Sequence, residues 1–366
     1  MAENGGGDAA LRAQRERIDA IDAELLQLFN ERAGLAQAVA EIKRADGASD
    51  GAFYRPEREA RILREVRANN AGPLPDEAVV RLFREVMSEC LALERPLTVA
   101  FLGPEGTFTE AAALKHFGHA VSTTPQTAIP EVFREVAAGS AHFGVVPVEN
   151  STEGVVTHTL DTLVRTPLAI CGEVSLRIHQ QLLSTAETPA AVTRVYSHAQ
   201  SLAQCREWLD AHLPDAERVA VASNAEAAQR AAEEAGAAAI ASAAAAERYA
   251  LPVLAGNIED EPDNTTRFLV LGPEDSAPSG TDKTTLVVSS PNKVGTLHGL
   301  LAPLARHGIN LTRVESRPSR QGVWAYLFYL DIEGHRADPV VAAALGELEA
   351  EASFFRVLGS YPRAAT

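Results

Sequence analysis

The sequence predicts a multidomain protein with an all-α N-terminal domain, an α/β middle domain and a small α+β C-terminal domain. Three observations predict it: apolar residues recur at helical spacing near the N-terminus, strands and helices alternate through the middle, and the last segment has the element order of a ferredoxin-like domain. A chain of 366 residues is also too long for one hydrophobic core. We expect domains over residues 11–95, 97–272 and 283–362, a disordered tail over 1–10 and a linker over 273–282.

Composition restricts the classes of function. The net charge of −16 argues against nucleic acid as a partner, and no apolar run is long enough for a membrane span. The three cysteines lie far apart without a CxxC pair, and the histidines show no HxxxH or HExxH spacing. The N-terminus lacks the basic and apolar regions of a signal peptide. We therefore expect a cytoplasmic protein with no metal site and no membrane contact.

The N-terminal region predicts a long helix from about Ala10 to Lys43. Its apolar residues keep heptad spacing from Ile18 to Ile42, and such a seam needs a partner, so we expect helix pairing between two chains. Arg32 occupies a seam position, and Lys43 lies near the same face. A cation in an apolar seam is costly unless an anion meets it.

Two further helices carry acidic side chains on apolar stripes. Glu59 lies one turn before Ile62 and Leu63, and the stripe from Val79 to Cys90 reaches Glu94. Charges of both signs on buried stripes favour a site for a small polar anion. The alternative is an interhelical salt-bridge network in a plain coiled coil.

This region resembles the all-helical chorismate mutase family over essentially its whole length. The resemblance implies a mutase site of charged side chains, namely Arg15, Arg32, Lys43, Arg58, Glu59 and Glu94. It implies that Arg15 reaches into a partner's site, that Lys43 meets the ether oxygen of the substrate, and that Glu94 stands where many members have glutamine. Rearrangement of chorismate to prephenate needs no cofactor, only a held substrate conformer and stabilised charge on that oxygen.

Alternating strands and helices follow. We expect strands over 97–102, 143–148, 194–197, 219–222, 237–241 and 268–271. This alternation predicts a mostly parallel sheet with helices on both faces. Such folds bind ligands at the carboxyl ends of their strands.

Polar segments at the ends of these strands predict the ligand site. Gly103–Thr109 leads into a helix whose free amides attract carboxylates, and a Pro-Val-Glu-Asn turn follows the strand over 143–148. Ser197 opens a helix that carries Gln204 on the same face, although Ser197 as a simple N-cap is the alternative. The stretch Asn264–Phe268 places a hydroxyl, a cation and an aromatic ring at the entrance of the last strand.

Together these segments resemble the prephenate dehydratase family over about residues 97–272. The resemblance implies two α/β lobes around a cleft, like a periplasmic solute-binding protein, with the chain returning to the first lobe near Pro252. It implies a site made of Glu149, Asn150, Ser197, Gln204, Thr266 and Arg267, adjoined by Thr107, Thr109 and Phe268. We expect Thr266 to donate a proton to the leaving hydroxyl, and Arg267 either to hold the substrate's side-chain carboxylate or to brace the site.

The C-terminal segment resembles an ACT regulatory domain of the phenylalanine-binding kind. Glu315-Ser316-Arg317-Pro318 matches that family's motif in full, whereas Gly295-Thr296-Leu297-His298 keeps only its glycine and leucine. The resemblance implies an effector site made of Asn292, Gly295, Leu297, Glu315, Ser316 and Arg317. A dimerisation module without a ligand is the alternative.

In this order the three resemblances predict a bifunctional, cofactor-free enzyme of L-phenylalanine biosynthesis. It would convert chorismate to prephenate and prephenate to phenylpyruvate, with feedback inhibition by phenylalanine, and would form a homodimer, with further association of dimers left open. One alternative is a dehydratase whose helical domain serves only dimerisation; another is a non-catalytic, two-lobed effector-binding sensor. Loss of chorismate followed by formation of phenylpyruvate discriminates among the three.

Overall fold

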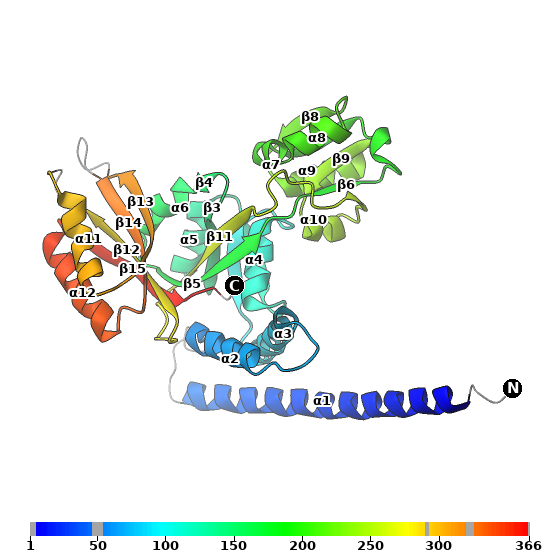
Figure 1. The fold of residues 1–366 in the computed structure, drawn as a ribbon, viewed down its shortest axis with the longest axis horizontal. Helices are drawn as coiled ribbons and strands as arrows, with labels where there is room; N and C mark the ends of the chain where they lie inside the picture. The colour runs from blue at the N-terminus through cyan, green and yellow to red at the C-terminus, as the bar shows by residue number, and fades with distance from the viewer. Residues whose placement is uncertain (1–4, 46–53, 290–292, 320–325, 365–366) are drawn as a thin grey trace.

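The computed structural model describes residues 5–45, 54–289, 293–319 and 326–364, and it shows three parts in chain order (Figure 1). A helical part is followed by a two-lobed α/β part and by a small sheet covered by two helices. No described helix combines the length and the apolar character needed to span a membrane.

The N-terminal part contains α1 (Gly5–Ala45), α2 (Pro56–Ala68) and α3 (Asp76–Glu94). The expected tail over 1–10 is wrong where the structure describes it, because α1 already begins at Gly5. Helix growth is cooperative, and Asp8 in the first turn favours the start of a helix. The predicted seam is present but largely uncovered: α1 extends as a rod (Figure 1), and its apolar side chains, such as Leu28 at 51 % exposure, face solvent.

The first lobe is built on a sheet of order β2-β1-β3-β11-β5. Its strands are β1 (Thr98–Leu102), β2 (Ser122–Gln126), β3 (Phe143–Asn150), β5 (Ala169–Arg177) and β11 (Thr265–Gly272), and β4 (Gly154–Val155) pairs with β3. Helices α4 (Phe108–Phe117), α5 (Ile129–Ala137) and α6 (Thr157–Leu163) pack against it. The expectation of a mostly parallel sheet is wrong, because β11 runs antiparallel to both β3 and β5. The chain leaves this lobe through β5 and returns through β11.

The second lobe contains a sheet of order β10-β6-β9-β7-β8. Its strands are β6 (Gln181–Ser184), β7 (Arg194–His198), β8 (Glu217–Val221), β9 (Ala237–Ala241) and β10 (Val253–Ala255), and its helices are α7 (Ala199–Gln204), α8 (Arg206–His212), α9 (Asn224–Glu233) and α10 (Ala243–Arg248). The chain returns to the first lobe after Ala255, later than the expected Pro252, because β10 still pairs with β6. Two backbone hydrogen bonds tie the crossing segments together: Ile178 N–H donates to Asn264 O and Ile258 N–H to Gln180 O.

The C-terminal part confirms the ferredoxin-like plan. Strands β12 (Asp282–Ser289), β13 (Leu311–Pro318), β14 (Tyr326–Glu333) and β15 (Phe354–Pro362) form an antiparallel sheet of order β13-β14-β12-β15, with α11 (Thr296–Arg306) and α12 (Pro339–Glu351) against it. The hairpin expected at residues 320–322 lies outside the described residues.

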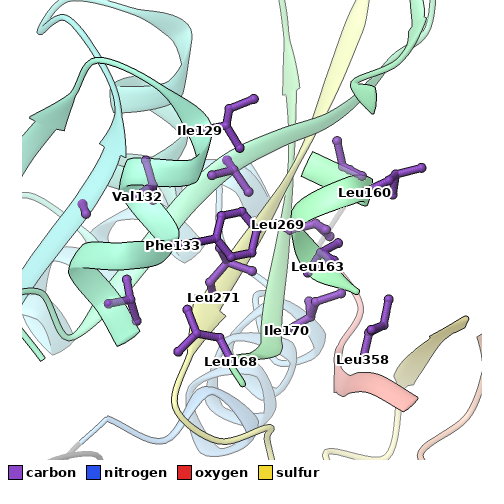
Figure 2. Close-up of a cluster of buried hydrophobic side chains, with 14 of the residues drawn as sticks. Ile129, Val132, Phe133, Leu160, Leu163, Leu168, Ile170, Leu269, Leu271 and Leu358 are labelled. Atoms are coloured by element: carbon purple, nitrogen blue, oxygen red, sulfur yellow. The ribbon is translucent and has the colours of Figure 1, made fainter. Parts of the chain in front are cut away.

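This small domain shares a hydrophobic core with the first lobe. Leu358 of β15 packs beside Leu160, Leu163 and Ile170 (Figure 2). Strand β15 passes so close to β5 that a Cβ on Gly359 would lie 2.1 Å from the carbonyl oxygen of Ile170. The segment expected to be a linker is also attached, because buried Ser276 donates a hydrogen bond to Cys171 O.

A methyl group at Gly359 should therefore weaken docking of the C-terminal domain. We expect Gly359→Ala to destabilise the protein by about 1–3 kcal/mol through overpacking, measured as a lower Tm. Gly346→Ala is the matched control, since nothing lies within 4 Å of its added Cβ. An unchanged Tm for Gly359→Ala would contradict the close packing of β15 on β5.

Candidate active sites

A cleft of about 220 Å³, partly open to solvent, lies between the two lobes. It contains five residues predicted from the sequence: Thr107, Thr109, Asn150, Gln204 and Thr266. The other lining residues come from both lobes and their connection: Leu102, Gly103, Phe108, Ile178, Gln180, His198, Gln200, Ser201, Ala222, Ser223 and Asn224. Chain segments far apart in the sequence thus converge on one cavity.

Thr266 and Asn150 form the polar wall of the first lobe. They are direct partners across β11 and β3, and Asn150 Nδ2 donates to Thr266 Oγ1 at 2.9 Å and to Asn264 Oδ1 at 2.8 Å. Asn150 Oδ1 accepts from the backbone N–H groups of Thr152 and Glu153, which fixes the orientation of the amide. Because Thr266 Oγ1 accepts from Asn150, its own O–H is left to donate toward the cleft.

The second lobe presents a wall of hydroxyl and amide groups. Gln180 Nε2 donates to Ser201 Oγ at 3.0 Å and to Gln204 Oε1 at 3.2 Å, and Asn224 Nδ2 donates to Ser201 Oγ at 2.9 Å. Ser197 lies beneath this wall and not in the cleft: it is fully buried and donates to Ile240 O at 2.8 Å. The cap of α7 is His198, whose ring nitrogen accepts from Gln200 N–H, so Ser197 is not the N-cap either.

Three further predicted site residues, Glu149, Arg267 and Phe268, also lie away from the cleft. β11 starts at Thr265, so alternation sends Thr266 and Arg267 to opposite faces of the sheet. Arg267 contacts Glu173 of β5 and also Asp331 and Tyr361 of the C-terminal domain. Its cross-strand partner Glu149 meets Arg313 there, and Phe268 is buried in the core. Of the two roles expected for Arg267, this geometry fits bracing.

The cleft has no fixed cation from the described part of the chain: none of its lining residues is lysine or arginine. The N-termini of α4 and α9 reach the cleft instead, through Thr107 to Thr109 and through Ser223 and Asn224. Thr107 caps α4 by accepting from Glu110 N–H. Free amides at such helix starts attract carboxylates.

The predicted mutase residues lie on the three N-terminal helices. Lys43 Nζ is 3.6 Å from Glu94 Oε2, so the structure brings these two together. Arg32 is half-buried, while Arg15 and Arg58 are exposed. Glu59 lies 3.6 Å from the guanidinium of Arg84, a residue that the sequence reasoning missed.

The predicted effector residues surround the start of α11 and strand β13. Gly295 has φ 79° and precedes α11, a left-handed conformation that favours glycine. Leu297 is partly exposed, and Arg317 pairs with Asp161 of α6 at 3.1 Å. Asn292 lies outside the described residues. Within the described residues, no group of three or more His, Cys, Asp or Glu side chains could hold a metal ion.

Three family models match the three parts of the chain. Chorismate mutase type II matches residues 14–95, prephenate dehydratase matches 99–276, and the ACT domain matches 284–350. The fold and the cleft thus define an enzyme in which a helical mutase, a two-lobed dehydratase and an ACT domain are joined.

One relative matches this chain along nearly its whole length, and two solved structures match about three quarters of it. The bifunctional chorismate mutase/prephenate dehydratase of Stutzerimonas stutzeri is 56% identical over 357 residues, which are 97% of this chain and 98% of that protein. Prephenate dehydratase from Arthrobacter aurescens in complex with L-Phe is 39% identical, with a TM-score of 0.68 over 73% of this chain and 90% of that one. GqqA, described as a quorum quenching acylase, is 31% identical, with a TM-score of 0.67 over 73% of this chain and 98% of that one.

The chain belongs to the bifunctional chorismate mutase/prephenate dehydratase family. It carries both activities of phenylalanine biosynthesis together with an ACT domain.

Glu59 gives the mutase region a pH dependence. Burial raises the pKa of Glu59 to about 7, although Arg84 opposes the shift. The folded state therefore holds this proton more tightly than the unfolded state, so the stabilising contribution is complete below about pH 4 and is lost as pH rises to about 7.

Thermal unfolding between pH 5 and pH 8 tests this shift. We expect Glu59→Gln to gain stability relative to wild type as pH rises, because the variant has no carboxylate to ionise, by up to about 3 kcal/mol. Exposed Glu65→Gln on the same helix is the control and should show no such trend. A constant difference between Glu59→Gln and wild type across this range would contradict the raised pKa.

Proposed function

We propose that the interlobe cleft is the dehydratase site and that Thr266 donates the proton to the leaving hydroxyl of prephenate. The observation that supports this most directly is the Asn150–Thr266 hydrogen bond, which engages a lone pair of the threonine oxygen and leaves its O–H for the cleft. Asn150 acts through Thr266, since its own amide is held by Asn264 and by backbone N–H groups. A positioned donor of this kind stabilises charge as the hydroxyl departs.

Neutral groups hold the substrate's carboxylates. The helix starts at Thr107 and Ser223 offer backbone N–H groups, and Ser201, Gln204 and Asn224 offer side-chain donors. The apolar lining residues Leu102, Phe108 and Ile178 suit the loss of carbon dioxide, because a carboxylate that leaves as carbon dioxide loses its charge and gains from weak solvation. A tightly paired cation at that carboxylate would oppose its departure.

The mutase site is completed by a second copy of the chain, so the protein is a homodimer. Support comes from the apolar seam of α1, which is exposed in a single chain although Leu25, Leu28 and Leu35 have the spacing of a packed helix. Lys43 beside Glu94 would stabilise the ether oxygen of chorismate, and Arg32 would bind a carboxylate. Arg15, far from Lys43 along α1, would serve the partner's site.

Phenylalanine is the effector of the ACT domain. The complex of the Arthrobacter aurescens relative with L-Phe supports this, as does the glycine at the start of α11. Gly295, Leu297, Glu315 and Ser316 would contact phenylalanine, together with Asn292. Arg317 would act on the site indirectly because Asp161 already binds it. The cytoplasm is the proposed compartment, in keeping with three free, buried cysteines.

The two sites should be separable by mutation. Thr266→Ala should lower dehydratase kcat by about a hundredfold or more through loss of the donor, with mutase activity retained. Arg32→Ala should do the reverse, because its charge lies in another domain. Both reactions are followed on purified protein, as loss of chorismate and formation of phenylpyruvate. If each substitution abolished both activities in folded protein, the assignment of two sites would be wrong.

A further inference from the structure

Strands β3 and β11 carry two neighbouring cross-strand pairs that face opposite sides of the first lobe. The register pairs Asn150 with Thr266 and Glu149 with Arg267. Because consecutive side chains on a strand point to opposite faces, the first pair lines the cleft and the second faces the ACT domain. The ACT domain therefore lies directly behind the residues proposed for the dehydratase chemistry.

Arg267 uses all three guanidinium nitrogens at this back face. Nε donates to Glu173 Oε2 at 2.8 Å, Nη1 to Asp331 Oδ2 at 2.5 Å and Nη2 to Tyr361 Oη at 2.9 Å. Asp331 lies on β14 and Tyr361 on β15, whereas Glu173 lies on β5 beside β11. One side chain thus connects the strand that carries Thr266 to two strands of the ACT sheet.

The acidic partner of Arg267 is itself held in one geometry. Asp331 is only 1 % exposed, and its second oxygen accepts from Thr285 at 2.7 Å. Burial pushes the pKa of Asp331 upward, but Arg267 and Thr285 hold it below its usual value. Asp331 is therefore an ionised carboxylate inside the protein, matched to the guanidinium.

A second arginine connects β13, the strand that carries predicted effector residues, to the paired strands β3 and β11. Arg313 Nε lies 3.0 Å from Glu149 Oε2, and Glu149 immediately precedes Asn150. Arg313 belongs to β13, which also carries the motif Glu315–Pro318. A displacement of β13 would therefore act on Glu149 through Arg313. It would also act on Arg267 through the ACT sheet, which contains β13, Asp331 and Tyr361.

These ion pairs contribute little to docking compared with the apolar contacts. The cluster around Leu358 (Figure 2), which also contains Tyr329, already joins the ACT domain to the first lobe. A buried ion pair loses much of its attraction to desolvation, and apolar side chains of the same volume often stabilise as well. Removal of one partner, however, leaves a buried charge, so the cluster fixes one arrangement of the strands.

We propose that Arg267 is a positioning residue of the dehydratase: its contacts with Asp331, Tyr361 and Glu173 hold β11 so that Thr266 keeps its place, and the ACT domain acts on the cleft through them. The inference rests on the assignment of Thr266 to the dehydratase reaction. It differs from a substrate-binding role, in which Arg267 would hold a carboxylate of prephenate.

Dehydratase kinetics of Asp331→Asn and Arg267→Gln, with and without phenylalanine, test the inference. We expect kcat to fall by about tenfold or more while KM stays within about threefold, because the change reaches the transition state through Thr266 and not through substrate contacts. Asp331 lies outside the cleft, and asparagine has nearly the same shape as aspartate. Arg267→Lys should recover part of the kcat that Arg267→Gln loses. Both Asp331→Asn and Arg267→Gln should also weaken phenylalanine inhibition.

Arg356→Gln is the matched control. Arg356 also joins the ACT domain to the first lobe, through Val164 O and Thr166 O, but away from the cleft. It should leave dehydratase kcat unchanged, and mutase activity in every variant reports folding. The double variant Arg267→Gln/Asp331→Asn should lose little more than either single variant, since the two act as one unit.

Three results would overturn the inference. A rise in KM at constant kcat for Arg267→Gln would assign it to substrate binding. Unchanged kcat and unchanged phenylalanine inhibition in Asp331→Asn would show that the ion pairs around Arg267 only attach the ACT domain. The same conclusion would follow if Arg356→Gln lost as much kcat as Arg267→Gln. Failure of the underlying assignment is recognised separately: Thr266→Ala would then keep its dehydratase kcat.

Discussion

Strand β11 is the element at which the cleft, the first lobe and the ACT domain meet. The alternation of its side chains between the two faces of the sheet is the constraint on which the rest of the structure depends. Thr266 faces the cleft, and Phe268 and Val270 lie in the hydrophobic core that contains Tyr54. Leu269 and Leu271 lie in the core that the first lobe shares with the ACT domain (Figure 2). Because side chains alternate strictly along a strand, a slip of one residue would exchange these faces. Pairing with β3 and β5 on either side fixes the register, so the hydroxyl proposed to donate the proton and both domain contacts are set together.

The mutase and dehydratase parts are joined by a specific contact and not by a flexible tether. Tyr54, just before α2, donates or accepts a hydrogen bond at 3.0 Å with His116 Nε2 of α4 and packs against Phe117 and Phe143. Burial lowers the pKa of His116 to about 3 and raises the pKa of Tyr54 well above its usual value, so both are neutral at physiological pH. This neutral hydrogen bond lies in an aromatic cluster at the contact between the two parts. Glu85 of α3 adds a second contact, 2.9 Å from the ring of His119.

Much of this organisation could be predicted because it depends on local patterns. Apolar runs predicted β3, β9 and the interior of β11, whereas β2, with the sequence Ser-Thr-Thr-Pro-Gln, has too few apolar residues to be recognised. The orientation of Arg267 could not be predicted: its polar neighbours hid the start of β11 at Thr265, and alternation from that start decides which face it occupies. Gln180 and Asn224 were missed as cleft residues because their role comes from segments that meet only in the folded chain. The motif Thr266–Phe268 could indicate which residues are important, but not which face of the sheet each side chain occupies.

We propose that the ACT domain acts on the dehydratase cleft through the face of β11 that lies opposite Thr266. The most direct test is hydrogen exchange of the backbone amides of wild-type enzyme, with and without phenylalanine. We expect phenylalanine to change protection at the ends of β3 and β11, around Asn150 and Thr266, as well as in the ACT domain. We expect Asp331→Asn to remove the change at the two strand ends only. Inhibition by phenylalanine with exchange altered only in the ACT domain, and no change around Asn150 and Thr266, would contradict it.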